Sequence, residues 1–384
     1  MKISRSQLAA GFKLCIPTFA LLLVGELLLR VTGVAPSGFF DFLLPTADGG
    51  LYPRNSTIEN DWGPIPYVSH TDSLGLRRID STKPVSSSCV RIITIGDSVT
   101  EGYFVDNSGT YPHFLQRFLD QSKFKTYQVL NAARGGGSID KELAILKNVA
   151  LALRPELVIL TFVTNDIVDL RGKTRAQLLA HRIQFDHSNV PIHRRVAFWV
   201  WSKTALGEAA YRLYWYLKYK RKYSKPAGKG DERYIIEGGG NFARNTEIFR
   251  TSFTDSDGMV LADEFSQEAR NLIDNYLFVL EEFVATCRSS DIAPVFVFFP
   301  AYSQVYDRSA PLEIRDLLRD NCKRLSVQFV DLTPTFRAQG ADEPIHLAPV
   351  DYHLNPRGNK IMARAIFDFL RAQQLIDPVH IPDD

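Results

Sequence analysis

The chain has 384 residues, of which 45% are hydrophobic and 23% are charged. This composition predicts a packed globular core, and the length allows one large α/β domain with an appendage or two small domains. A net charge of +2 excludes a strongly basic or strongly acidic protein, so it gives no reason to expect a nucleic-acid or acidic partner.

The N-terminal region predicts a membrane helix. The apolar stretch from Leu14 to Arg30, extended to Val34, approaches the ~20 residues that such a helix needs. Basic residues precede it, which predicts that the N-terminus stays inside and the body is exported. Glu26 interrupts the stretch, but Arg30 lies one turn later and can pair with it. We therefore expect residues 1–35 to form an uncleaved signal anchor; a cleaved signal peptide and a buried core helix are the alternatives.

The next region, residues 36–88, is rich in Pro, Gly, Ser and Asp. It is interpreted as a linker and a loosely structured lead-in to the main domain. That domain is expected over residues 89–375, in the periplasm or at the cell surface. The four cysteines include no Cys-x-x-Cys pair, which gives no support to a cysteine zinc site or a thioredoxin-like redox site. No metal or cofactor is expected for the function. A disulfide between Cys287 and Cys322 stays open, since it requires a location outside the cytoplasm.

The main domain alternates strands and helices. Ile92 to Ile95 is short, apolar and β-branched, which is typical of a buried parallel strand. The alternation implies a parallel sheet with helices on both faces. Further strands are predicted at 127–131, 157–163, 294–300 and 327–332, and helices at 111–124, 141–153, 266–287, 311–325 and 360–370.

Polar or glycine-rich turns follow the first three strands. Ser98 ends the Gly-Asp-Ser sequence after the first strand, at the sheet edge where α/β proteins bind ligands. The second strand leads to glycines 135–137, whose backbone N–H groups can approach a ligand closely. Asn165 follows the third strand and can donate a hydrogen bond into the same crevice. Helix capping is the alternative for the serine and asparagine sites, and a flexible turn for the glycines.

Residues 171–265 form an insertion in which the alternation lapses. Its segment 211–225 is basic and aromatic and contains no acidic residue. This pattern suits a membrane surface or an anionic polymer. Single-stranded nucleic acid is recognised by similar chemistry, but it is not expected to meet an exported domain. A solvated basic helix that covers the domain is the alternative.

The last informative stretch lies before the C-terminal helix, which Pro356 opens and Asn355 can cap. Asp351 and His353 are two residues apart in an extended loop, so their side chains can point the same way. A hydrogen-bonded loop histidine is one alternative for His353. A metal site formed by His346, Asp351 and His353 is another.

Together these residues supply the parts for acyl transfer. Ser98 would attack an ester carbonyl, His353 would take its proton, and Asp351 would hold the imidazole tautomer. The backbone N–H groups of Ser98 and Gly136 and the side-chain amide of Asn165 would bind the oxyanion.

In these blocks the sequence resembles the SGNH (GDSL-type) hydrolases, particularly membrane-anchored bacterial members. The resemblance covers residues 91–370 and implies a flavodoxin-like three-layer α/β/α sandwich that hydrolyses esters, often acetyl groups on carbohydrates. Two positions depart from the family pattern: Val163 replaces a usual glycine, and Asp351 precedes His353 by two residues rather than three. The matching blocks are 96–98 with the nucleophile, 131–136 and 164–166 with the oxyanion donors, and 351–353 with the acid and base.

The resulting hypothesis is a membrane-anchored, extracytoplasmic serine esterase acting on O-acyl groups of a glycan or lipid. An O-acyltransferase that passes the acyl group to a sugar hydroxyl of a cell-envelope polysaccharide uses the same residues and stays open. A non-catalytic glycan- or lipid-binding module is disfavoured, because the complete catalytic set is present.

Overall fold

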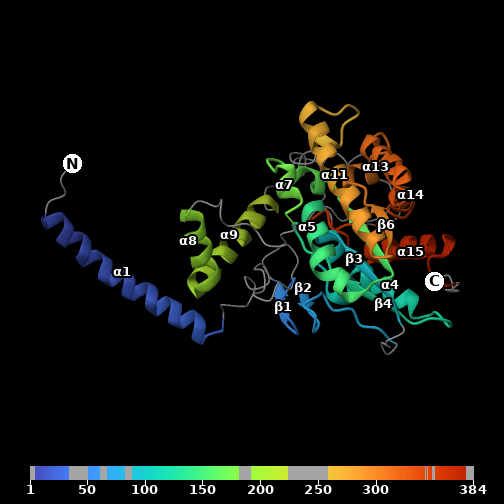
Figure 1. The fold of residues 1–384 in the computed structure, drawn as a ribbon. Helices are drawn as coiled ribbons and strands as arrows, with labels where there is room; N and C mark the ends of the chain where they lie inside the picture. Colours follow the sequence, from blue (N-terminus) through green and yellow to red (C-terminus); the bar gives the residue numbers. More distant parts are fainter. Residues whose placement is uncertain are drawn as a thin grey trace.

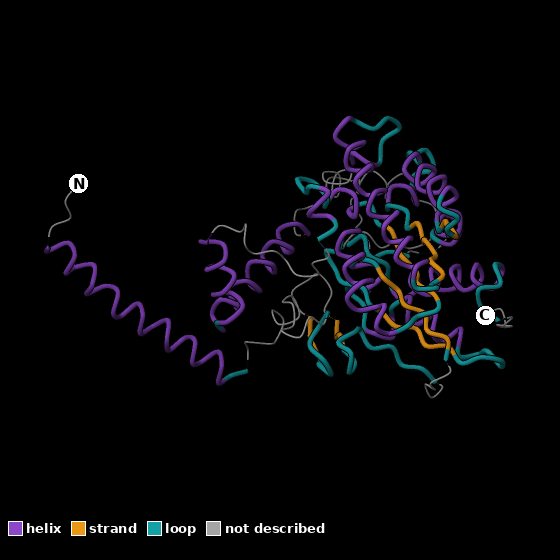
Figure 2. Tube along the Cα trace, in the orientation of Figure 1, coloured by secondary structure: helices purple, strands orange, loops and turns teal. Residues whose placement is uncertain are grey.

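The computed structural model describes residues 5–33, 51–60, 67–82, 89–180, 192–223, 258–341, 343, 345–347 and 351–377. Figure 1 shows an α/β domain from which the N-terminal helix projects, with two further helices beside its C-terminal end. In Figure 2 the strands of the main sheet run side by side with helices around them.

The main sheet has five parallel strands in the order β4-β3-β5-β6-β7. This is the flavodoxin-like order: β3 comes first in the chain, β4 lies on one side of it, and β5 lies on the other side. The predicted parallel sheet is confirmed, and each predicted strand is observed with small differences at its ends. The strands are β3 (Val90–Ile95), β4 (Tyr127–Asn131), β5 (Leu157–Phe162), β6 (Ala293–Phe298) and β7 (Gln328–Asp331).

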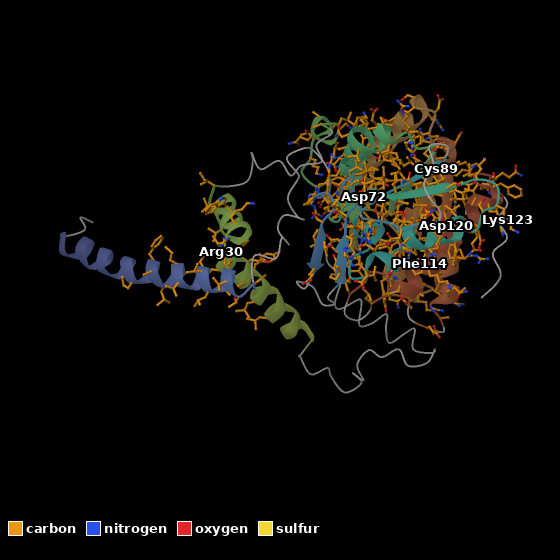
Figure 3. The ribbon with its side chains drawn as sticks, turned by 90° about the horizontal axis from the view of Figure 1, so that it is seen from below. Arg30, Asp72, Cys89, Phe114, Asp120 and Lys123 are labelled. Carbon is orange, nitrogen blue, oxygen red and sulfur yellow. The ribbon has the colours of Figure 1, made fainter. Side chains whose placement is uncertain are left out.

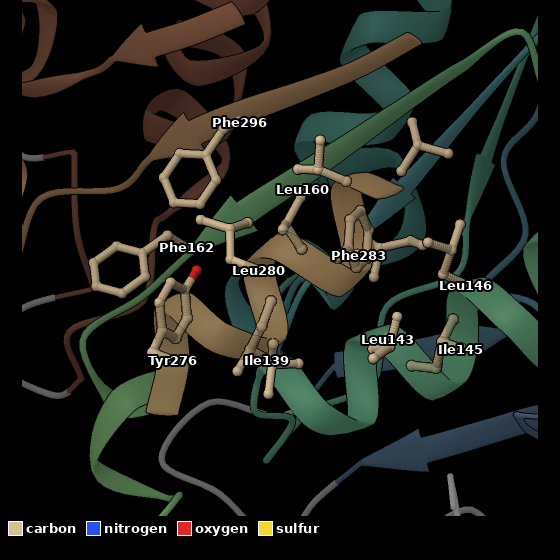
Figure 4. Close-up of a cluster of buried hydrophobic side chains, with 14 of the residues drawn as sticks. Ile139, Leu143, Ile145, Leu146, Leu160, Phe162, Tyr276, Leu280, Phe283 and Phe296 are labelled. Atoms are coloured by element: carbon tan, nitrogen blue, oxygen red, sulfur yellow. The ribbon is translucent and has the colours of Figure 1, made fainter. Parts of the chain in front are cut away.

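Helices cover both faces of this sheet because alternate side chains of each buried strand point to opposite faces. Ile93 and Ile95 of β3 join one apolar cluster, and Ile92 joins the other. Figure 4 shows the first cluster, where Phe162 and Phe296 from the sheet lie near side chains of the long helix α11. The first face carries α5 (Ile139–Ile145), α11 (Gln267–Ser289) and α13 (Glu313–Arg324), and the second carries α4 (Tyr111–Leu119), α12 (Tyr302–Tyr306), α14 (Thr333–Gln339) and α15 (Pro356–Ala372).

Local capping sets where several helices begin. Thr110, Ser266 and Asn355 each accept a hydrogen bond from a backbone N–H in the first turn of α4, α11 and α15. Asn355 therefore caps α15 as predicted. The helix expected over 141–153 is α5 followed by a π turn and a 3₁₀ turn. The remaining helices are α1 (Arg5–Val31), α3 (Ser98–Glu101), α6 (Asn165–Val168), α7 (Arg175–Leu178), α8 (Ile192–Lys203) and α9 (Ala205–Tyr223).

The lead-in is more ordered than predicted. Its strands β1 (Thr57–Asn60) and β2 (Tyr67–His70) pair in an antiparallel sheet. Asp72, labelled in Figure 3, closes the following turn by accepting hydrogen bonds from two backbone N–H groups. Leu76 and Arg77 after this turn are fully buried. The prediction of a loose lead-in is wrong for these residues, because the turn residues that suggested disorder instead form tight turns between short strands.

The predicted transmembrane helix is not found: within the described part of the chain, no helix is long and apolar enough to cross a membrane. The predicted pair of Glu26 and Arg30 does form, at 2.7 Å. The carboxylate of Glu26 also accepts the N–H groups of Ala205 and Leu206 at the start of α9, while Arg30 donates to the carbonyl of Lys203 at the end of α8. Figure 3 shows Arg30 at this junction. These charges therefore join α1 to the inserted helices.

The disulfide left open by the sequence is not formed. Cys287 and Cys322 are free, buried thiols within the first apolar cluster. Burial raises the pKa of each thiol to about 12, because the apolar surroundings disfavour the thiolate.

Candidate active site

The turn after β3 places Ser98 at the carboxyl edge of the sheet. Asp97 is the N-cap of α3, and its carboxylate accepts the N–H of Val99 at 2.9 Å. The capping alternative therefore applies to Asp97, and Ser98 occupies the first helical turn, where its hydroxyl lies 3.2 Å from Oδ2 of Asp97. Gly96 is required here, since a Cβ at this position would lie 2.3 Å from the hydroxyl of Thr100.

Ser98, His353 and Asp351 form a continuous hydrogen-bonded chain. The Oγ of Ser98 lies 2.8 Å from Nε2 of His353, although the two residues are 255 positions apart in the sequence. The Nδ1 of His353 hydrogen-bonds to Oδ1 of Asp351, which also accepts the His353 backbone N–H at 2.9 Å. All three side chains are buried. A hydroxyl, an imidazole and a carboxylate in this order are the arrangement of an activated nucleophile.

Aromatic rings surround His353. Tyr352 stacks on its imidazole with ring centroids 4.5 Å apart, and Tyr103 stacks at 5.6 Å. Phe104 meets the imidazole edge-on at 5.5 Å, and its backbone has φ of 62°, a strained value for a residue other than glycine. These contacts hold the ring in place. The sequence reasoning missed Tyr103 and Phe104, because only the folded chain brings their loop to His353.

Asn165 lies at the start of α6, beyond the carboxyl end of β5. Its side chain hydrogen-bonds to Asp97, and the N-cap of α6 is Thr164. The capping alternative for Asn165 is therefore wrong, and the amide lies beside the nucleophile turn; its role as an oxyanion donor stays a prediction. Burial raises the pKa of Asp97, opposed by its hydrogen bonds from Val99, Asn165 and Ser98. Asp97 thus links the nucleophile to the asparagine, a role that the sequence reasoning missed.

Gly136 lies in the loop after β4 with φ of 67°, a conformation that favours glycine. The residue is exposed, and no atom lies within 4 Å of the position of a Cβ. A Cβ on the next residue, Gly137, would lie 3.6 Å from the Cα of Asp97, so the loop passes close to the nucleophile turn. The role of Gly136 as an oxyanion donor stays a prediction.

His346 is separate from the triad. Its side chain is buried with Nδ1 3.0 Å from the hydroxyl of Tyr306, and the rings of Phe299, Tyr302 and Phe336 surround it. Burial lowers the pKa of His346 to about 3. Among the described residues, no three His, Cys, Asp or Glu side chains are grouped to hold a metal ion, so the alternative that combined His346 with the triad is not supported.

A known protein family matches most of the chain. Residues 94–361 match the GDSL-like lipase/acylhydrolase family. The chain belongs to this family. The resemblance to the SGNH (GDSL-type) hydrolases is thereby confirmed, but the match does not show the membrane-anchored type, and this GDSL-like chain is a carboxylic ester hydrolase. No curated protein matches its sequence.

Several solved structures are similar to this GDSL-like chain. The acetyl xylan esterase AlAXEase is 14% identical, with 73% of this chain and 98% of that chain covered and a TM-score of 0.40. TesA is 13% identical, with 73% and 98% covered and a TM-score of 0.39. The acetylxylan esterase Axe2 from Geobacillus stearothermophilus is 13% identical, with 74% and 97% covered and a TM-score of 0.40.

Proposed function

We propose that the chain is a serine esterase that removes acetyl or other short O-acyl groups from a carbohydrate or lipid through a covalent acyl-enzyme. The observation that carries this proposal is the hydrogen-bonded chain from Ser98 through His353 to Asp351, with 2.8 Å between the serine Oγ and the imidazole Nε2. The nucleophile, its base and the group that orients the base are all in place.

The reaction begins when Ser98 Oγ attacks the ester carbonyl and its proton moves to Nε2 of His353. Asp351 accepts the Nδ1–H of the resulting imidazolium and stabilises its charge. The N–H groups of Ser98 and Gly136 and the amide of Asn165 donate to the oxyanion, and each such donor lowers the barrier by roughly 3–4 kcal/mol. The imidazolium then protonates the leaving alcohol, which leaves the acyl group on Ser98.

The second half repeats these steps with water. His353 removes a proton from a water molecule, whose oxygen attacks the acyl carbonyl, and Ser98 departs with the proton. The products are the free acid and the unchanged enzyme. Tyr352 favours a carbohydrate as the proposed substrate: the residue is 36% exposed beside His353, and its ring offers a flat apolar face on which a sugar ring can lie.

The test is product analysis with p-nitrophenyl acetate, with and without a soluble xylo-oligosaccharide as acceptor. We expect free acetate as the product in both cases. Neither the sugar nor an added metal ion should increase the rate of p-nitrophenol release. Transfer of most acetyl groups to the sugar would identify an O-acyltransferase instead. Release that persists after a fluorophosphonate has labelled Ser98 would overturn the covalent serine mechanism.

We further propose that the chain associates with a membrane and that its catalytic domain lies outside the cytoplasm. Support comes from apolar side chains on α1 and α8: Leu21 is 78% exposed, Phe19 is 67% exposed and Trp199 is 61% exposed. Exposed apolar surface of this extent favours a lipid interface. Part of the basic segment 211–225 continues this region on α9, where Leu213 and Tyr214 are also exposed.

Sedimentation with vesicles of phosphatidylcholine and phosphatidylglycerol tests this association. The full chain should pellet with the vesicles, and a Phe19→Ser/Leu21→Ser/Trp199→Ser variant should pellet less. Equal recovery of both proteins in the supernatant would contradict the proposal.

A further inference from the structure

The lead-in segment holds the turn that follows the nucleophile helix. Arg77 is only 1% exposed, and its guanidinium donates to the carbonyls of Glu101 at 2.8 Å and Gly102 at 2.6 Å and also to that of Val105. Its Nε donates to the side chain of Asn107 at 3.2 Å. A buried cation is costly unless its N–H groups are paired, and here they pair with the backbone of residues 101–105.

This turn supports the catalytic imidazole. Tyr103 and Phe104 lie within the span that Arg77 holds, and both rings contact His353. A non-glycine residue with φ of 62°, as at Phe104, persists only where its surroundings enforce it. The hydrogen bonds of Arg77 on both sides of Phe104 supply that enforcement.

Glu101 connects the same segment to the glycine loop. Its carboxylate is fully buried, and Oε2 accepts the hydroxyl of Tyr52 at 2.6 Å and the backbone N–H of Gly135 at 2.5 Å. Gly135 directly precedes Gly136. Arg134 adds a second link, since its guanidinium lies over the Tyr52 ring at 5.4 Å and donates to the carbonyl of Leu51 at 2.8 Å.

We infer that Glu101, held by Tyr52 and Arg77, is a positioning residue for the proposed ester hydrolysis. It acts through the N–H of Gly135 to set the loop that presents Gly136 to the oxyanion. The inference rests on the proposed function, and it assigns the lead-in a part in the active site.

The inference predicts which kinetic constant changes. The oxyanion exists only in the transition states and tetrahedral intermediates, so a displaced N–H donor weakens their binding and leaves substrate binding nearly unchanged. A displaced N–H donor should therefore lower kcat and change KM little. A contribution to fold stability alone would lower the melting temperature without this change in kcat.

The experiment compares Tyr52→Phe and Glu101→Gln with Tyr127→Phe in the full chain. Tyr127 is the matched control, because its buried hydroxyl accepts one backbone N–H, from Asp377, at 2.8 Å, and it begins β4 at the opposite edge of the sheet. With p-nitrophenyl acetate, we expect kcat to fall about tenfold in Tyr52→Phe and more in Glu101→Gln, as one or more charge-assisted hydrogen bonds are lost. In both variants KM should stay within about threefold of the parent value. In the Tyr127→Phe control, kcat should stay within about twofold of the parent value.

Fluorophosphonate labelling of Ser98 provides the second readout, since the phosphoryl oxygen also needs the oxyanion donors. The labelling rate should fall with kcat in Tyr52→Phe, which loses only one hydroxyl and is the variant expected to fold. A folded Tyr52→Phe protein with the kcat and labelling rate of the parent would overturn the inference. A parent that shows no Ser98-dependent turnover would instead overturn the proposed function, and the inference with it.

Discussion

The buried histidine outside the triad makes stability depend on pH. His346 is neutral in the folded chain, because burial lowers its pKa to about 3 from an ordinary value of 6.5. The nearby His353 lowers this pKa further, and Asp351 opposes the shift. In the unfolded chain the imidazole takes up a proton near pH 6.5. The unfolded state therefore gains protons first as the pH falls, and the folded state loses stability below pH 6.5.

The size of this loss follows from the two pKa values. Each pH unit between them costs about 1.4 kcal/mol, so His346 removes about 2 kcal/mol of stability between pH 6.5 and pH 5. The full loss approaches about 5 kcal/mol at pH 3, below which both states hold the proton.

Urea unfolding at pH 8 and pH 5 measures this effect in the parent and in His346→Gln. Glutamine retains a group that can hydrogen-bond to Tyr306 but does not titrate. Between pH 8 and pH 5, the free energy of unfolding of the parent should fall by about 2 kcal/mol more than that of His346→Gln. His193→Gln, which changes an exposed histidine of α8, is the control and should behave as the parent does. Equal losses in the parent and His346→Gln would refute the reasoning.

Three further results are expected. Asn165→Ala should lower kcat by about 10²–10³-fold, as for the loss of one oxyanion donor, whereas a loss under about tenfold would show that the amide does not reach the oxyanion. Asp351→Asn should lower kcat by about 10⁴-fold, because the amide favours the wrong imidazole tautomer; steady-state kinetics would show a far smaller loss if another group orients His353. Dithiothreitol should leave the melting temperature unchanged, since Cys287 and Cys322 are free thiols, and a fall of several degrees would reveal a disulfide.

The strands of the sheet and the separate blocks that carry the candidate site residues could be predicted because each signal is local. The apolar run of β3 marks a strand that is buried on both faces, and Ser98 follows its end directly. Asn165 follows β5, the neighbour of β3 in the sheet, so strand order alone brings these two residues together. His353 and Asp351 lie two residues apart in a single loop.

The lead-in could not be predicted in this way. Arg77 binds backbone carbonyls, which every sequence offers, so no partner residue marks its destination. Tyr52 and Glu101 are 49 positions apart and share no repeating pattern. The apolar N-terminal stretch was misleading for a related reason: Glu26 and Arg30 contact α8 and α9, and nothing in the local pattern reveals those partners.

The most direct measurement is p-nitrophenyl acetate turnover by the full chain and by Ser98→Ala at equal folded concentration. The alanine variant should retain the circular dichroism and melting temperature of the parent, because only a hydroxyl is removed. Its turnover should fall to the rate in buffer, since removal of the nucleophile blocks the acyl-enzyme. Turnover by a folded Ser98→Ala protein at more than a tenth of the parent rate would contradict the serine mechanism.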